Sequence, residues 1–212
     1  MEERASGIIL RTRPLTETSL IVHLLTRELG RIALVAKGAR RPKSPYAGKL
    51  DLFYEIDATF SRSRKSELHN LRETALREIH TAVRRDIVRL NAAAYATVLV
   101  ELGTETETPI PEFYELILQA IRALDRVSPA PAFVLALETK YLSITGLTLV
   151  SGGLSRAATT VFEAFEGLPL EGANEVPLAP ALFHEIELAL RRAIGAALER
   201  LPPLREQLLR SR

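Results

Sequence analysis

The sequence predicts an α+β protein, with a small antiparallel β-barrel first and an all-α helical domain after it. In residues 1–79, apolar and polar side chains alternate over short segments, which is the period of half-buried strands. In residues 80–212, apolar side chains recur every three or four positions, which is the period of amphipathic helices. The change of period near residue 80 therefore predicts a boundary between two domains.

The first domain is predicted to form five short strands joined by polar turns. The expected strands span residues 7–15, 19–26, 31–37, 50–60 and 68–75. Alternation is clearest in the fourth strand, with one set of residues facing in and one facing out: Leu52, Tyr54, Ile56, Ala58 and Phe60 against Asp51, Phe53, Glu55, Asp57 and Thr59. Five strands in about 75 residues fit an OB-fold barrel best, and an SH3-like barrel is the alternative.

The second domain is predicted to form packed helices whose ends are marked by Gly and Pro. The recurring apolar residues are Val83, Ile87, Leu90, Ala94 and Val98, then Phe113, Leu116, Ile117, Ala120, Ile121 and Leu124, then Val134, Leu137, Tyr141 and Ile144, and finally Phe183, Ile186, Leu190, Ile194, Ala197 and Leu201. Pro109 and Pro111 are expected to open the second helix and Pro180 the last, Gly146 to end one, and Pro202 and Pro203 to end the last. The Thr/Glu run at 104–108 is expected to be a solvated connection between helices.

A basic loop follows the third strand. Lys37, Arg40, Arg41 and Lys43 lie within a stretch that holds no acid. Gly38 permits backbone angles that other residues avoid, and two prolines stiffen the path, so the loop cannot rejoin the sheet. Because guanidinium groups suit phosphate oxygens, we interpret the loop as a phosphate-binding segment, and a merely solvated hairpin loop is the alternative.

Composition limits the other classes of protein. The chain has 212 residues, 47% of them hydrophobic, which is enough for real cores, and no apolar run reaches the length of a membrane span. It has no cysteine, so disulfides and thiolate metal sites are excluded, and we expect a cytoplasmic protein. Residues 1–80 hold 15 Lys and Arg against 10 Asp and Glu, whereas residues 81–212 hold 13 against 16. An anion-binding surface should therefore be local and lie in the first domain.

The residues favour binding over catalysis. The four histidines are His23, His69, His80 and His184. None has the spacing of a metal-ligand pair. His23 alternates with apolar residues in its strand, which indicates a structural or surface group. Asp51, Glu55 and Asp57 share one face of the fourth strand and could serve a metal-dependent nuclease, but alternation explains them as solvent-facing. We expect no enzymatic activity, no metal and no cofactor.

With the basic loop, the strand count and the helical half in view, the chain resembles the bacterial RecO family of recombination mediators. The matching segments are residues 7–11, 16–19, 24–26, 30–31, 35–44 and 68–73. The most specific of them reads Val-Ala-Lys-Gly-Ala-Arg-Arg-Pro-Lys-Ser at 35–44. The likeness is strong over the first 80 residues, moderate to residue 146 and weak afterwards.

The resemblance implies an N-terminal OB-fold nucleic-acid-binding domain, residues 1–79, and a helical domain, residues 80–212, in a protein of recombinational DNA repair. Proteins of this family bind single- and double-stranded DNA and anneal complementary strands. With RecR they load RecA on DNA covered by single-stranded-DNA-binding protein, and none of this needs a catalytic residue. Grooves between the helices would suit an amphipathic or acidic peptide of a protein partner.

The resemblance also strengthens the phosphate interpretation of the basic loop. We expect two groups of phosphate contacts, the second in the connection between strands four and five: Lys37, Arg40, Arg41 and Lys43, and Arg62, Arg64 and Lys65. Phe53 and Tyr46 are candidates for stacking on bases, with packing in the core as the alternative for each. An RNA-associated OB-fold module would use the same loop and is the alternative function.

Many members of the family insert a four-cysteine zinc module at the place of residues 150–172. This segment has no cysteine here, so we expect no structural zinc. It is predicted instead to contain a short helix that is capped by Ser155 and ends near Gly167.

Overall fold

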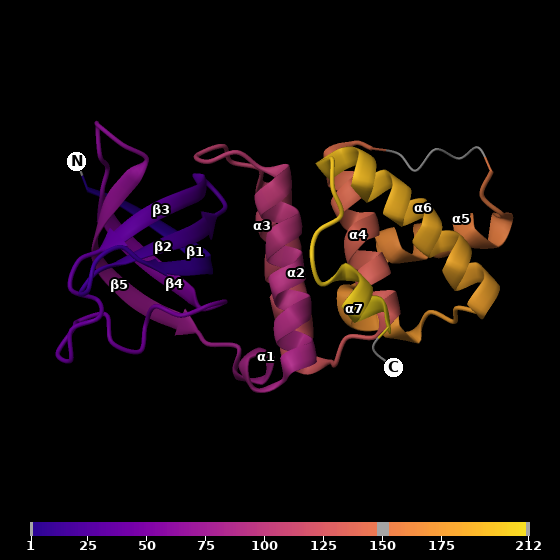
Figure 1. Cartoon of the computed structure of the whole chain (residues 1–212), viewed down its shortest axis with the longest axis horizontal. Coiled ribbons are helices and arrows are strands. Elements are labelled where there is room, and N and C mark those ends of the chain that lie inside the picture. The colour runs from indigo at the N-terminus through magenta and orange to yellow at the C-terminus, as the bar shows by residue number, and fades with distance from the viewer. Residues whose placement is uncertain (1, 148–152, 211–212) are drawn as a thin grey trace. The chain divides into compact units, whose positions relative to one another are not determined.

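The computed structural model describes residues 2–147 and 153–210 and divides into two compact units (Figure 1). The first unit joins Met1–His80 with Thr104–Glu115, and the second joins Thr81–Gly103 with Leu116–Arg212. The division near residue 80 coincides with the change of period in the sequence. Residues 104–115 return to the first unit, and the change of period does not predict this return.

The first unit is a closed five-stranded barrel with the order β1-β2-β3-β5-β4. Its strands are β1 (Glu2–Pro14), β2 (Leu20–Thr26), β3 (Gly30–Ala36), β4 (Glu55–Ser61) and β5 (Leu68–Glu78). β3 and β5 pair in parallel, and the other neighbours pair antiparallel. This is an OB-fold barrel, so the predicted fold class is confirmed and the SH3-like alternative is wrong.

β1 closes the barrel because it is long enough to pair with two neighbours. Its first part, Glu2–Ile8, pairs with β4, and its later part, from Gly7 to Pro14, pairs with β2. The register shifts between Ile9 and Arg11, as expected where a strand bends from one partner to another. A side chain at Gly7 would lie 2.3 Å from the carbonyl oxygen of Leu25, so only glycine permits this close pairing.

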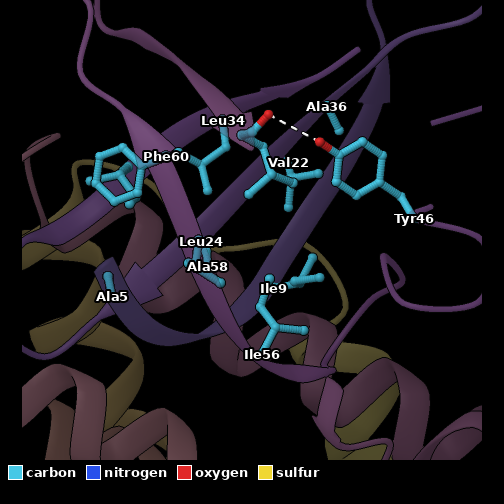
Figure 2. Close-up of a cluster of buried hydrophobic side chains, with 12 residues drawn as sticks. Ala5, Ile9, Val22, Leu24, Leu34, Ala36, Tyr46, Ile56, Ala58 and Phe60 are labelled. Carbon is cyan, nitrogen blue, oxygen red and sulfur yellow. Dashed lines mark hydrogen bonds between the residues drawn. The ribbon is translucent and has the colours of Figure 1, made fainter. Parts of the chain in front are cut away.

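Alternating side chains of all five strands fill the barrel (Figure 2). The buried cluster consists of Ala5, Ile9, Val22, Leu24, Ile32, Leu34, Ala36, Tyr46, Ile56, Ala58, Phe60 and Leu71. The inward set predicted for the fourth strand is confirmed at Ile56, Ala58 and Phe60. Burial of these apolar side chains at about 25 cal/mol per Å² is the main favourable contribution to the stability of this unit.

The start of the fourth strand is not where alternation predicts it. The strand begins at Glu55, because Phe53 adopts a left-handed backbone angle (φ 63°) that ends the extended path. Phe53 is also buried, at 2% exposure, and its backbone N–H donates to the carbonyl of Ile9 over 2.8 Å. The outward position expected for Phe53 is therefore wrong, as is the solvent-facing position expected for Glu55, which is buried.

Residues 104–108 connect two helices and three of them are exposed, as their composition predicts, but the segment also bonds to the barrel. The N–H of Glu107 donates to the carbonyl of Arg31 over 2.9 Å, and Arg31 Nη2 donates to the carbonyl of Thr104 over 2.5 Å. An isolated parallel bridge also pairs Arg31 with Thr106. This segment therefore extends the barrel unit at the start of β3.

The second unit is built from helices around one buried helix. The elements are α1 (Thr81–Arg85), α2 (Ile87–Gly103), α3 (Pro111–Arg126, whose first residues belong to the first unit), α4 (Pro131–Thr145), α5 (Arg156–Gly167), the 3-10 helix η1 (Leu170–Glu175), α6 (Pro180–Leu198) and α7 (Arg205–Arg210). α4 packs against α2, α5, α6 and α7, and nearly every residue of Ala132–Leu142 is buried.

Most predicted helix ends are confirmed. Pro111 and Pro180 open α3 and α6, and Gly146 ends α4 in a left-handed conformation (φ 70°) with its N–H bonded to carbonyls of the last turn. Ser155 caps α5 by accepting from the N–H of Ala158, and the helix ends at Gly167, as predicted. Of the segment 150–172, residues 150–152 lie outside the described part of the chain.

The apolar stripe predicted for the first helix is confirmed only at Val83, which is buried and lies in the separate short helix α1. Ile87 is 67% exposed, and the buried face runs instead through Ala92, Tyr95, Ala96 and Leu99. The helix is apolar on most of its circumference, so its period does not identify the packed side. The stripe predicted for α3 is confirmed in full, because polar residues there mark the opposite face.

A buried network of charged and hydrogen-bonded side chains joins four helices of the second unit, α2, α4, α6 and α7. Arg205 of α7 is 1% exposed and makes two hydrogen bonds with Glu138 of α4, of 2.7 and 2.9 Å, and a third with Glu187 of α6 of 2.5 Å. The hydroxyl of Tyr95 donates to the same carboxylate of Glu138. Burial raises the pKa of Glu138, and the hydrogen bonds from Arg205 act against that effect. Arg205 is therefore the charge that allows an ionised carboxylate inside the bundle.

We expect Arg205→Met to lower the free energy of unfolding by about 3–5 kcal/mol at pH 7, because it leaves Glu138 buried without a cation. The raised pKa of Glu138 means that the orphaned carboxyl takes up a proton as the pH falls, so the loss should shrink toward pH 5. Urea denaturation at both pH values measures this.

The matched control is Arg210→Met in the same helix, because the ion pair of Arg210 with Glu206 is exposed and should contribute less than about 1 kcal/mol. Adding Glu138→Leu to Arg205→Met should restore most of the lost stability. A loss at Arg205 no larger than at Arg210 would contradict the role given to the network.

Candidate nucleic-acid interface

The basic loop leaves β3 at Ala36 and follows a series of turns. Lys37, Arg40, Arg41 and Lys43 are all exposed. Backbone hydrogen bonds from Arg41 to Gly38, from Ser44 to Arg41 and from Ala47 to Ser44 fold the path back on itself. Gly38 adopts a left-handed angle (φ 71°), which is the freedom predicted for it. The loop therefore holds four cations on a compact support.

Tyr46 anchors the far end of the basic loop in the barrel. Its side chain is buried and lies among the core residues (Figure 2). Its hydroxyl oxygen lies 3.0 Å from the carbonyl oxygens of both Leu71 and Arg72 of β5. Burial raises the pKa of Tyr46, so the phenol keeps the proton that it donates. The expectation that Tyr46 stacks on bases is wrong, because its ring faces the core. The same holds for Phe53, which is also buried.

The near end of the basic loop is attached to the turn between β1 and β2. The N–H of Arg40 donates to the carbonyl of Thr18 over 3.0 Å, and Arg40 Nη1 lies 3.2 Å from the carbonyl of Thr16. The turn is itself ordered, since Thr16 Oγ1 accepts from the N–H groups of Thr18 and Ser19. In OB-folds this first turn is one of the two loops that bind oligonucleotides. The basic loop therefore lies beside a binding edge of the barrel.

The second predicted patch lies in the connection between β4 and β5, residues 62–67. Arg64 and Lys65 are exposed, as expected. Arg62 instead forms ion pairs with Glu3, of 2.9 Å, and with Glu107, of 2.5 Å. These contacts raise the pKa of Arg62, through the hydrogen bond with Glu3 first, and lower the pKa of Glu3. The positive charge of Arg62 is thus already balanced by two carboxylates.

His69 links that connection to the segment 104–108. Its ring stacks on Phe60 at 5.6 Å, Nδ1 accepts from the N–H of Ser63 over 3.3 Å, and Nε2 lies 2.9 Å from a carboxylate oxygen of Glu107. His69 belongs to segment 68–73, one of the segments that resemble the RecO family. It therefore has a structural role in the barrel. Sequence reasoning missed Glu107 because nothing local relates it to Arg62 or His69.

The carboxylates considered for a nuclease are engaged by different partners. Glu55 is bonded to His80 over 2.9 Å, and Asp51 caps the N–H of Leu52. Burial by itself would raise the pKa of Asp57, but hydrogen bonds from Arg77 and Ser6 outweigh it, and the pKa is lowered. In residues 2–147 and 153–210, no three His, Cys, Asp or Glu side chains are grouped closely enough to hold a metal ion.

Membrane insertion finds no support in the described helices either. Within residues 2–147 and 153–210, no helix combines the length and the apolar character that crossing a bilayer requires.

Comparison with known proteins matches residues 1–80 and 84–151 to one family. A family model described as "Recombination protein O N terminal" matches residues 1–80, and one described as "Recombination protein O C terminal" matches residues 84–151. DNA repair protein RecO of Bacillus pumilus is 35% identical over 144 residues, which are 68% of this chain and 56% of that protein. RecO of Rhodopirellula baltica is 36% identical over 140 residues (66% and 52%), and RecO of Bacillus subtilis is 32% identical over 147 (69% and 57%). The chain thus spans about half the length of these curated relatives.

We expect Tyr46→Phe to loosen the basic loop while the barrel stays folded. The substitution removes a buried hydroxyl and leaves two carbonyl groups with one donor fewer, at a cost of about 1–2 kcal/mol. Hydrogen exchange should then quicken at the loop amides and stay unchanged at the turn between β2 and β3, which serves as the internal control. Equal acceleration at both places would show general destabilisation and contradict the anchoring role.

Proposed function

The chain belongs to the RecO family, and from this premise we propose that it is a DNA-binding recombination mediator in recombinational DNA repair. The observation that carries the proposal is the basic loop, because four exposed cations are held on one support beside the first turn of an OB-fold. Four exposed like charges repel one another, and an anionic polymer relieves that repulsion. We propose that the polymer is DNA and that single and double strands both bind.

The chemistry of the loop implies binding without sequence preference. Lysine and arginine recognise phosphate oxygens, and phosphate contacts fix position but carry no base identity. Burial of Phe53 and Tyr46 removes the aromatic platforms that we expected to add base stacking. Affinity should therefore be governed mainly by charge and fall steeply with salt.

Annealing follows from the same surface. Two complementary strands repel each other through their phosphates, and a basic face that covers phosphates while leaving bases unread lowers that repulsion. In the proposed pathway the protein acts with RecR to load RecA on DNA coated by single-stranded-DNA-binding protein. None of these steps asks for a catalytic group, and we propose no enzymatic activity.

The helical unit is the part that we propose for protein partners. A hollow between α4 and α5 is lined by Leu142, Phe162, Glu163 and Glu166, among others. Its apolar floor suits an amphipathic segment, whereas the two carboxylates would repel an acidic one. Of the two kinds of peptide expected from the sequence, this hollow favours the amphipathic kind with cationic residues.

Replacing Lys37, Arg40, Arg41 and Lys43 together by Ala should weaken single-strand binding and flatten its salt dependence. At about −0.7 per phosphate contact, four contacts supply a log–log slope of roughly −3, which the variant should lose. Fluorescence anisotropy with a labelled oligonucleotide over a range of salt concentrations gives the slope.

A variant with the same charge change controls for net charge. Arg85, Arg156, Arg192 and Arg200 are exposed residues of the helical unit, and their replacement by Ala should leave most of the slope in place. Arg62→Ala should also change the slope little, because that cation is already paired. An unchanged slope in the loop variant would overturn the proposal, and tighter binding of structured RNA than of DNA would favour the RNA-associated module.

The annealing step has its own test. Complementary oligonucleotides coated with single-stranded-DNA-binding protein should form duplex faster when the protein is added, and the loop variant should lose most of that acceleration. The helical-unit variant should retain it. No acceleration by the unaltered protein would exclude annealing while leaving DNA binding standing.

A further inference from the structure

The outer face of β1 and β2 carries a further group, two arginines and a histidine, outside both predicted patches. Arg11 of β1 pairs directly with His23 of β2 in the antiparallel ladder. Arg13 lies two residues further along the same face, and its Nη2 is 3.2 Å from Nε2 of His23. Both arginines are exposed and the histidine is half-buried. Since Val22 and Leu24 point into the core, His23 between them points outward.

The strand register places this group below the basic loop and, across β3, in the same row of residues as the start of β5. At the rim, Pro14, Leu20 and Ala36 lie side by side, and the basic loop starts directly after Ala36. Three residues back from the rim, about 10 Å along the strands, a row crosses the sheet. It contains Arg11, His23, Ala33 and Leu68, in that order. Leu68 is the first residue of β5 after the connection that carries Arg64 and Lys65.

We propose that Arg11, Arg13 and His23 form a phosphate-binding group on this face, next to the basic loop, and that His23 takes up a proton when a nucleic-acid phosphate binds there. The inference deepens the proposed function and rests on it. It makes DNA affinity rise as the pH falls through the range in which imidazole titrates.

The direction of the proton uptake follows from the groups that face His23. Burial lowers the pKa of His23, and the positive charges of Arg13 and Arg11 on β1 and of Arg31 on β3 lower it further. The ring is therefore neutral at pH 7, and Nε2 can accept the N–H of Arg13. A phosphate placed beside Arg13 and His23 brings negative charge. This charge favours the imidazolium and raises the pKa of His23 in the complex.

Protonation of His23 would break its hydrogen bond with Arg13. Protonation gives Nε2 a hydrogen, so it no longer accepts from Arg13. Imidazolium and guanidinium then both donate to oxygens of the same phosphate. Hydrogen bonds between charged groups are stronger than those between neutral groups. The bound anion thus compensates for two cations in contact.

A binding titration across pH tests the proposal. Affinity for a single-stranded oligonucleotide should rise several-fold from pH 8 to pH 5.5, with about tenfold as the upper limit if binding raises the pKa of His23 by one unit. His23→Gln should flatten that dependence, and Arg13→Ala should weaken binding about fivefold at 0.1 M salt, the share of one single-strand phosphate contact. The matched control is His184→Gln, since His184 is an exposed histidine of α6 and should leave the pH dependence as it is.

The pKa of His23 can also be measured in the unaltered protein by nuclear magnetic resonance. This test does not depend on whether a variant folds. A pKa that rises when oligonucleotide is added supports the inference, and an unchanged pKa overturns it. If the His23 and Arg13 variants bind like the unaltered protein while the basic-loop variant loses binding, this inference fails and the proposed function stands. If the basic-loop variant also binds normally, the proposed function fails with it.

Discussion

Closure of the barrel by β1 is the constraint on which the arrangement of the whole first unit depends. One strand pairs with β4 through its first part and with β2 through its later part, and the register shift near Leu10 lets it bend between them. This closure fixes the turn between β1 and β2 at the rim where β3 ends. The basic loop can then bond to that turn through Arg40 and enter the core through Tyr46. Its cations are therefore positioned by backbone pairing elsewhere in the barrel.

The fold was predictable where local rules and packing agree. Alternation identified the five strands, and proline, glycine and serine at α3, α4, α5 and α6 marked helix ends, because these residues act through the backbone of their own segment. The errors arise where tertiary contacts decide. Phe53 leaves its strand to fill a buried position, and α2 buries a face that an almost uniformly apolar helix does not reveal. α7 was not predicted, since it owes its place to the burial of Arg205 against Glu138.

The candidate site shows the same division between local and distant causes. Glycine freedom and a run without acids were enough to identify the basic loop, and the exposure of its four cations agrees with that reading. The same pattern of basic residues in 62–67 did not reveal that Arg62 is paired, because its partners Glu3 and Glu107 lie 59 and 45 residues away. Arg11 and Arg13 were overlooked for the opposite reason. They are two residues apart, as on the outward face of any strand. Only the pairing of β1 with β2 shows that His23 lies beside them.

The return of the chain to the barrel through residues 104–115 bears on the order in which the protein can mature on the ribosome. Domains generally fold from the N-terminus as they emerge, and all five strands are available once β5 has been made. At that moment Arg31 lacks the carbonyl of Thr104, and both Arg62 and His69 lack the carboxylate of Glu107. The nascent barrel therefore lacks these contacts with Thr104 and Glu107 until all of α2 has been synthesised. Its final stability is reached only after that helix, so completion of the first unit is coupled in time to the start of the second.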